Sequence, residues 1–297
     1  MQDISVIILT FNEERHIRRA LENARKFAKE VFVVDSYSTD RTVEIAQEMG
    51  AKVYQHEWEN HSRQFAWALA NLPVTTEWIW RLDADEYLTN ELIAEIEDIL
   101  PQNDGTTNGY TAMRIYKFMG RPVTHGIISP IMLRLFRRGH AKIEDQMMDE
   151  HIYVTDGKVG ALRNAFYDEN FMSLTEWTQK HNGYATREAM DLLMTEYGLK
   201  AEETAGNIGP HSMAVRRKKM KYTRLPLFWR SMALFVYRYI FRLGFLDGKE
   251  GFLWHFLQGF WYRTLADAKV YEIKKRMNFD DGKIKAWLEE TSHKHTN

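Results

Sequence analysis

Two aspartates separated by one residue, Asp83 and Asp85, follow a short apolar segment that predicts a buried strand at residues 78–82. Because side chains two residues apart on a strand point to the same side, both carboxylates can converge on one divalent cation. Mg²⁺ and Mn²⁺ prefer oxygen ligands and commonly complete their coordination with substrate phosphates. The pair therefore predicts a metal site for a phosphorylated ligand, with a solvated acidic turn as the alternative.

Further candidate binding residues follow the first two predicted strands: Thr10, Phe11, Asn12 and Glu13 after the first, and Asp35 after the second. In open α/β sheets, ligands bind outside the carboxyl ends of the strands. An aspartate at the position of Asp35 can accept a hydrogen bond from a ribose hydroxyl or a base N–H. Asp40 lies beside a predicted helix start and fits a capping role better. These strand ends favour a nucleotide as the ligand.

Strand and helix patterns alternate along the first part of the chain. Predicted strands lie at residues 4–9, 31–34, 52–56 and 78–82, and predicted helices at 13–29, 42–49, 62–71 and 89–100. This alternation predicts an α/β fold with a mostly parallel sheet flanked by helices on both faces. Less regular strand patterns follow at 110–116 and 132–136, and a further helix at 174–194.

Composition excludes several classes of function. The formal net charge of the 297 residues is -1, so no overall field calls for a nucleic-acid partner. The absence of cysteine excludes disulfides, thiolate zinc sites and cysteine nucleophiles. The N-terminus runs directly into the first apolar segment without the pattern of a secretory signal, so we expect a cytoplasmic protein.

Three segments resemble glycosyltransferase family 2 in their order and spacing: residues 7–14 (IILTFNEE), 33–40 (VVDSYSTD) and 82–86 (LDADE). The chain looks like the branch that builds bacterial cell-surface polysaccharides and the lipopolysaccharide core. Residues 133–139 (LRLFRRG) and 148–151 (MDEH) extend the likeness to about residue 155.

The resemblance implies a GT-A (Rossmann-like) fold, a nucleoside diphosphate sugar as donor, with a UDP-sugar favoured, and inversion at the anomeric carbon. It implies that Thr10 to Glu13 and Asp35 cradle the base and ribose. Asp83 would lie near the ribose and the metal, and Asp85 would hold Mg²⁺ or Mn²⁺ on the diphosphate. Arg63 lies where such enzymes often carry a cation near the nucleotide. Two departures are Gln64, where Asn is more usual, and Phe11, which lacks the hydroxyl of the commoner Tyr.

Inverting transfer also needs a base to take the proton of the acceptor hydroxyl. Glu150, favoured by the resemblance, and Asp149 are the candidates, and an ordinary acidic surface stretch is the alternative. His125 and His151 are expected to line the acceptor side without a catalytic role.

The last part of the chain has a different composition. A basic run at residues 216–221 precedes two aromatic-rich stretches at 225–245 and 252–262, and neither stretch has the ~20 uninterrupted apolar residues of a spanning helix. We therefore expect a GT-A catalytic domain at residues 1–215, with a nucleotide-binding half (1–100) and an acceptor half (101–215), and a helical region at 216–297. That region suits a membrane interface.

A lipid-linked saccharide acceptor would explain this composition, with the enzyme peripheral on the cytoplasmic face of the inner membrane. The alternative is that the helices of residues 216–297 pack on the catalytic domain or pair two subunits.

Two other functions also stay open. A sugar nucleotidyltransferase can use the same sheet and acids, but it usually carries a glycine- and Lys/Arg-rich phosphate loop, whereas residues 10–13 contain no glycine. A catalytically silent membrane-associated scaffold with the same fold predicts no divalent-metal dependence of nucleotide binding. The donor sugar, the linkage and the oligomeric state are left open.

Overall fold

The computed structural model describes residues 2–127, 130–144, 151–199, 222–223 and 225–294. They divide between two compact units. The first unit comprises residues 2–122 and the described part of 128–171, and the second comprises 123–127 with the described residues from 172 onward. The predicted boundary between residues 215 and 216 lies outside the described residues.

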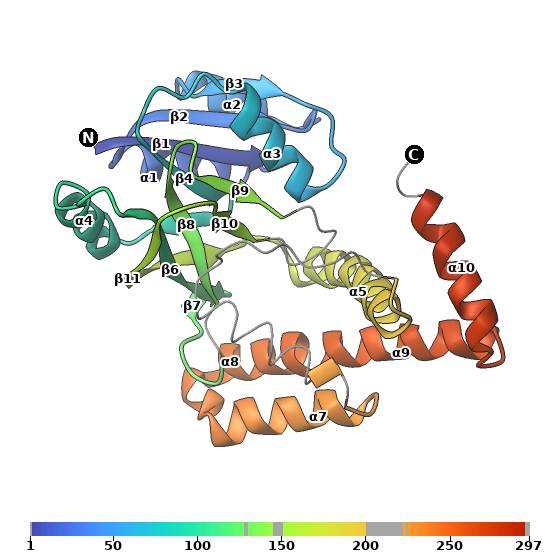
Figure 1. The fold of residues 1–297 in the computed structure, drawn as a ribbon. Coiled ribbons are helices and arrows are strands. Elements are labelled where there is room, and N and C mark those ends of the chain that lie inside the picture. Colours follow the sequence, from blue (N-terminus) through green and yellow to red (C-terminus); the bar gives the residue numbers. More distant parts are fainter. Residues whose placement is uncertain (1, 128–129, 145–150, 200–221, 224, 295–297) are drawn as a thin grey trace. The chain divides into compact units, whose positions relative to one another are not determined.

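A mixed sheet forms the first unit (Figure 1). Its strands are β1 (Gln2–Thr10), β2 (Ala28–Asp35), β3 (Lys52–Gln55), β4 (Trp78–Asp83), β5 (Glu86–Leu88), β6 (Thr107–Phe118), β7 (Arg121–Pro122), β8 (Ile131–Arg137) and β11 (Lys158–Glu169). They are ordered β3-β2-β1-β4-β8-β6-β11-β5, with β7 paired to β6. The four strands from β3 to β4 are parallel, as are β6 and β11, whereas β8 is antiparallel to β4 and β6.

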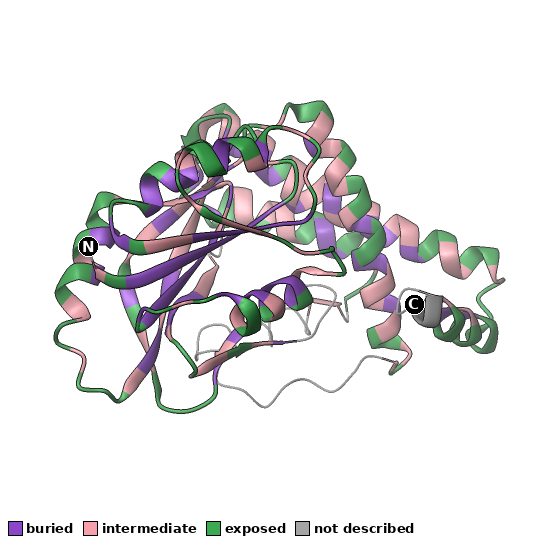
Figure 2. Ribbon diagram, turned by 90° about the horizontal axis from the view of Figure 1, so that it is seen from above, coloured by how far each residue is buried: buried purple, intermediate pink, exposed green. Residues whose placement is uncertain are grey.

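Both faces of this sheet are covered. The helices of the unit are α1 (Ile17–Ala24), α2 (Thr42–Glu48), α3 (His61–Asn71) and α4 (Asn90–Ile99), and β9 (Ala141–Ile143) pairs with β10 (Ile152–Val154). Ile4, Val6 and Ile8 of β1 share one core with α1, α2 and α4, and Ile7 and Leu9 share the other with α3, β9 and β10. Figure 2 shows the central strands as buried. The predicted α/β sheet flanked by helices is confirmed.

One predicted helix is shorter than expected. The helical spacing of residues 13–29 included Phe27 and Ala28, but α1 ends at Ala24. The N–H of Gln2 donates to the carbonyl of Phe27, and Ala28 begins β2. Sheet pairing therefore takes the last apolar positions away from the helix.

The described part of the second unit is helical. Its elements are α5 (Leu174–Glu196), α7 (Trp229–Val236), η1 (Tyr237–Phe241), η2 (Gly244–Asp247), α8 (Gly248–Trp254), η3 (His255–Trp261), α9 (Tyr262–Arg276) and α10 (Asp281–Lys294). Val270 of α9 packs with Leu193 of α5 and with Ile284 and Leu288 of α10. Within the described residues, none of the helices has both the length and the apolar character needed to cross a bilayer.

Candidate functional site

The ends of β1 and β2 are joined through Asp35. Thr10 and Asp35 are partners in the parallel register, and the Thr10 hydroxyl donates to Asp35 Oδ1 at 3.0 Å. The Ser38 N–H donates to Asp35 Oδ2 at 2.8 Å, and Gln55 Nε2 lies 3.4 Å from the same oxygen. Asp35 is fully buried. Its carboxylate therefore organises the loop itself, and a nucleotide group must share or displace one of these donors.

The loops that follow β1 and β2 interlock. The Asn12 N–H donates to Ser38 Oγ at 2.8 Å, the Thr39 N–H donates to Asn12 Oδ1 at 2.9 Å, and the Glu13 N–H donates to Thr42 Oγ1 at 2.7 Å. These bonds hold the loop of the predicted binding residues against the start of α2. The chemistry of residues 10–13 is thus presented on a fixed backbone.

Two aromatic rings flank these loops. Phe11 and Tyr37 are each 56% exposed, and Tyr37 has a left-handed φ of 58°. That conformation is costly for a bulky residue and persists only where the surroundings enforce it. Phe11 was identified from the sequence, but Tyr37 was not, because its strain is visible only in the backbone.

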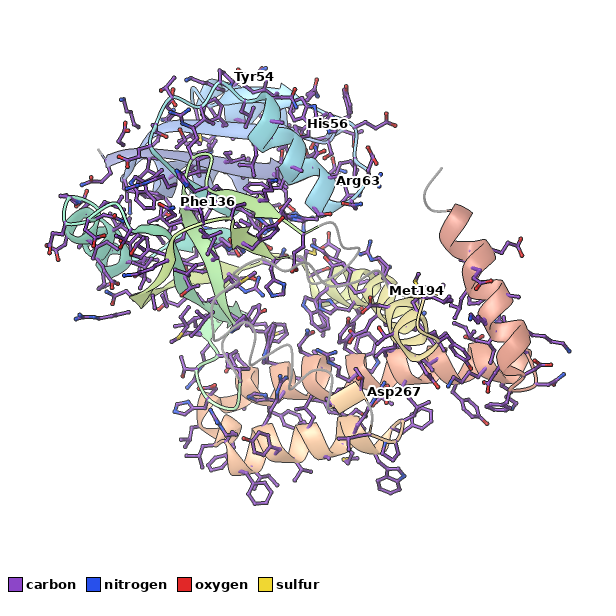
Figure 3. All side chains as sticks on the ribbon, viewed as in Figure 1. Tyr54, His56, Arg63, Phe136, Met194 and Asp267 are labelled. Atoms are coloured by element: carbon purple, nitrogen blue, oxygen red, sulfur yellow. The ribbon has the colours of Figure 1, made fainter. Side chains whose placement is uncertain are left out.

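Arg63 lies near the start of α3, where its guanidinium pairs with Glu59 (Figure 3). Its neighbour Gln64 is buried and donates to Ser36 Oγ at 3.0 Å and to the His56 carbonyl at 3.1 Å. The amide that departs from the usual family residue thus ties α3 to the end of β2.

Asp83 lies among cations at the end of β4. Its Oδ2 accepts from Arg134 Nη2 at 3.1 Å, and its Oδ1 lies 3.6 Å from Arg81 Nε and 3.8 Å from His61 Nε2. Burial alone would raise the pKa of Asp83, but Arg134, Arg81 and His61 together hold it well below its usual range. The negative charge of the Asp83 carboxylate is therefore already balanced by cations of the protein.

Asp85 has a different environment. Its Oδ2 accepts from Asn170 Nδ2 at 2.9 Å, and its backbone carbonyl accepts from the Glu169 N–H at 2.9 Å and from Arg19 Nη2 at 3.1 Å. The side chain is held by a neutral amide, and the guanidinium binds the backbone. Asp85 consequently keeps a carboxylate that can bind a cation.

Arg19 connects this loop to the end of β11. Its Nη1 donates to Glu169 Oε2 at 2.9 Å and its Nη2 to the Glu169 carbonyl at 2.6 Å. The guanidinium lies 4.7 Å from the ring centroid of Tyr87 and 4.3 Å from that of Phe171. Arg19 belongs to no motif found in the sequence, so its role emerges only from the fold.

His16 continues this connection to the first loop. The Phe171 N–H donates to His16 Nε2 at 2.9 Å, so the neutral imidazole carries its proton on Nδ1. That Nδ1 lies 2.6 Å from Glu13 Oε2 and donates to it. Glu13 and Asp85, two predicted binding residues, are thereby tied to the same short segment after β11.

Buried charged side chains pair with one another next to Asp83 and Asp85. Arg134 is 1% exposed and lies 2.5 Å from Glu86 Oε1, while Arg114 lies 3.6 Å from Asp168 Oδ2. Burial and Asp85 raise the pKa of Asp168 to about 7, although Arg114 opposes the rise. Sequence reasoning missed Arg114 and Asp168. One signal of a buried ion pair was available in the sequence, because Arg134 lies between Leu133 and Leu135 in an apolar strand.

Of the two aspartates Asp83 and Asp85, only Asp85 has surroundings that suit a metal ligand. Among the described residues, no group of three or more His, Asp or Glu side chains is placed to hold a metal ion. A cation beside Asp83 would meet Arg134 and Arg81, whereas Asp85 carries an amide-supported carboxylate. Asp85 therefore fits a metal that takes most of its other ligands from substrate phosphates and water.

The two candidate bases, Asp149 and Glu150, lie outside the described residues. His151 Nδ1 lies 3.4 Å from Glu144 Oε2 in the first unit. His125 belongs to the second unit, where its Nδ1 lies 2.6 Å from Asp247 Oδ1. Their expected place beside an acceptor stays a prediction.

Known proteins of similar sequence identify the family of this chain. The family model of glycosyl transferase family 2 matches residues 5–171. An uncharacterized glycosyltransferase of Rickettsia bellii is 30% identical over 93% of this chain and 88% of its own length. The lipopolysaccharide core biosynthesis glycosyltransferase LpsC of Rhizobium meliloti is 26% identical over 94% of this chain and 96% of its own length. TarS of S. aureus (residues 1–349, in complex with UDP-GlcNAc) is 14% identical over 94% of this chain and 92% of that chain, with a TM-score of 0.43. The chain belongs to glycosyl transferase family 2.

Proposed function

We propose that the protein is an inverting, metal-dependent hexosyltransferase that moves a sugar from a nucleoside diphosphate sugar, with UDP favoured, to a saccharide acceptor in cell-surface polysaccharide synthesis. The observation that carries the proposal is the contrast between Asp83 and Asp85. Cations surround the first, while a neutral amide holds the second. Two adjacent carboxylates with separate tasks suit a nucleotide and its metal.

The donor would bind at the carboxyl ends of β1, β2 and β4. The exposed rings of Phe11 and Tyr37 offer a stacking face for the base. Asp83, kept ionised by its cations, would accept from a ribose hydroxyl, and Arg63 would add positive charge near the nucleotide. Asp85 would hold Mg²⁺ or Mn²⁺, which offsets the charge that develops on the leaving diphosphate.

The acceptor half of the reaction rests on the sequence. Glu150 or Asp149 would take the proton of the acceptor hydroxyl as its oxygen attacks the anomeric carbon opposite the leaving diphosphate. The name of the R. meliloti relative supports a place in lipopolysaccharide core synthesis. We propose a lipid-linked acceptor, met at the cytoplasmic face of the inner membrane.

Calorimetric binding tests the donor assignment. UDP, GDP, CDP and dTDP are titrated with Mn²⁺ and with a chelator into the wild type, Asp85→Ala and Asp98→Ala, an exposed control on α4. Tight binding of one nucleotide that needs metal and is lost only in Asp85→Ala supports the proposal and names the donor class.

Other outcomes would replace the proposal. Absence of nucleotide binding under every condition indicates a catalytically silent member of the family. Release of pyrophosphate from a nucleoside triphosphate and a sugar 1-phosphate indicates a nucleotidyltransferase.

A further inference from the structure

One side of the second unit carries large apolar side chains in solvent. On the helix formed by α7 and η1, these side chains recur at helical spacing, and more follow in the turn to η2. We name this set the α7 face: Trp229, Met232, Tyr237, Ile240, Phe241, Leu243, Phe245 and Leu246. Trp229 is 76% exposed and Phe241 is 72% exposed. Contiguous exposure of this kind marks an interaction surface rather than scattered surface residues.

Polar contacts on the opposite side of the helix fix its orientation. The buried Arg230 guanidinium binds Asp267 of α9, with Nε 2.9 Å from Oδ1 (Figure 3 labels Asp267). Ser231 Oγ lies 2.8 Å from Thr264 Oγ1, and the Phe228 N–H donates to Asp267 Oδ2 at 2.7 Å. Rotating the helix to bury the α7 face would separate the buried Arg230 side chain from Asp267 and break these hydrogen bonds. The exposed face is therefore a fixed property of this unit.

The charge of the surrounding sequence identifies the partner. Residues 204–246 contain no Asp or Glu and, apart from the buried and ion-paired Arg230, eight basic residues, at positions 216–219, 221, 224, 238 and 242. Lys and Arg are drawn to anionic headgroups, and Trp and Tyr rings favour headgroup depth. A helix with aromatic residues on one face lies in the plane of the membrane rather than across it.

We propose that the α7 face inserts into the headgroup region of a bilayer that contains anionic lipid. This deepens the proposed function, because a lipid-linked acceptor is met at such a surface. Its test nevertheless uses neither donor nor acceptor, so either proposal can fail alone.

The experiment is vesicle flotation of the full chain. Wild type should bind phosphatidylcholine vesicles that contain phosphatidylglycerol and bind pure phosphatidylcholine vesicles much more weakly. The double variant Trp229→Ser, Phe241→Ser should lower the partition coefficient about tenfold or more, since each ring contributes apolar area. Phe279→Ser, which removes a 54% exposed ring of the same unit outside the α7 face, should leave it unchanged.

A second variant tests the charge alone. Arg242→Gln removes an exposed cation and no ring, and should lower binding only to the anionic vesicles, by about fivefold. Equal binding of wild type and both variants overturns the proposal, as does equal binding to both lipids. Lipid-free dimers that the same ring substitutions dissociate would assign the face to a second copy instead. A far-UV circular dichroism spectrum and a cooperative urea unfolding transition like those of the wild type show that the double variant is folded.

Discussion

The Nη2 atom of Arg19 lies 3.1 Å from the backbone carbonyl oxygen of Asp85, across 66 residues of sequence. The same guanidinium binds both the side chain and the carbonyl of Glu169. Arg19 thus fixes the loop of Asp85 to the end of β11 before any ligand arrives. A carboxylate that binds a metal works best when a supporting shell sets its position in advance.

Replacement of Arg19 by lysine should weaken metal-dependent nucleotide binding. Lysine keeps the charge but loses the planar fork that reaches Asp85 and Glu169 together. Because changes in such supporting residues commonly cost 10–100-fold in metal affinity, we expect Arg19→Lys to lower Mn²⁺ affinity in the presence of nucleotide by about tenfold. Calorimetry measures this, with Arg18→Lys as the control, since Arg18 is 54% exposed. An equal loss of binding in chelator would point to a purely structural role.

Replacement of Arg134 by methionine should destabilise the first unit strongly. Arg134 is the buried cation between Asp83 and Glu86, so its loss leaves two carboxylates close together without their shared partner. Removing one partner of a buried ion pair costs about 3–5 kcal/mol in unfolding free energy. Urea unfolding measures the loss, and Glu86→Gln in the same background should recover part of it. Arg137→Met on the same strand should cost much less, because Arg137 is 21% exposed. Equal losses at the two positions would contradict the assigned role.

The fold of the first part of the chain could be predicted because its strands carry strong local signals. Apolar, β-branched residues fill β1 and β2, and turn residues follow each strand. β11 escaped prediction, although it is as long as β6, because polar residues such as Arg163, Asn164 and Asp168 interrupt its pattern. Its register comes from long-range pairing with β6 and β5 rather than from its own sequence.

The candidate site could likewise be predicted only in part from local sequence patterns. Asp83 and Asp85 were found from their spacing alone, but their different partners could not be. Arg134 reaches Asp83 from β8, and Asn170 reaches Asp85 from beyond β11. Contacts between residues tens of positions apart depend on strand order, which local patterns do not specify.

The free energy of unfolding of the first unit should decrease as the pH is lowered, because Glu30 becomes protonated. Burial alone would raise the pKa of this carboxyl, but hydrogen bonds from Lys52, Thr75 and Ser5 lower it from 4.5 to about 2. The unfolded chain therefore binds more protons than the folded chain between these values, so the contribution is full above pH 4.5 and is lost as the pH falls toward 2. We expect Glu30→Gln to lower the unfolding free energy at neutral pH by about 1–2 kcal/mol. Urea unfolding across acidic pH should show the difference from wild type shrinking below pH 4.5. A difference that stays constant would contradict the assignment.

The stability of the segment of residues 123–127 should depend on the absence of a side chain at Gly126. Its φ is 73°, and a Cβ atom there would lie 2.6 Å from the carbonyl oxygen of Arg238 and 2.6 Å from the imidazole of His255. The Gly126 N–H also donates to the Arg242 carbonyl at 2.9 Å, so the backbone cannot move away without losing that bond. Gly198, in the same unit, has a φ of 68° but nothing within 4 Å of its added Cβ.

The two glycines therefore separate backbone strain from steric clash. Gly198→Ala should cost about 1 kcal/mol, which is the strain of a left-handed residue alone. Gly126→Ala adds overpacking against a backbone carbonyl, so we expect a loss of about 3 kcal/mol or more. Thermal and urea unfolding of the full chain, followed by tryptophan fluorescence, measure both losses. Equal losses would mean that the segment shifts to accommodate the methyl group, and that the close approach to Arg238 and His255 contributes nothing to stability.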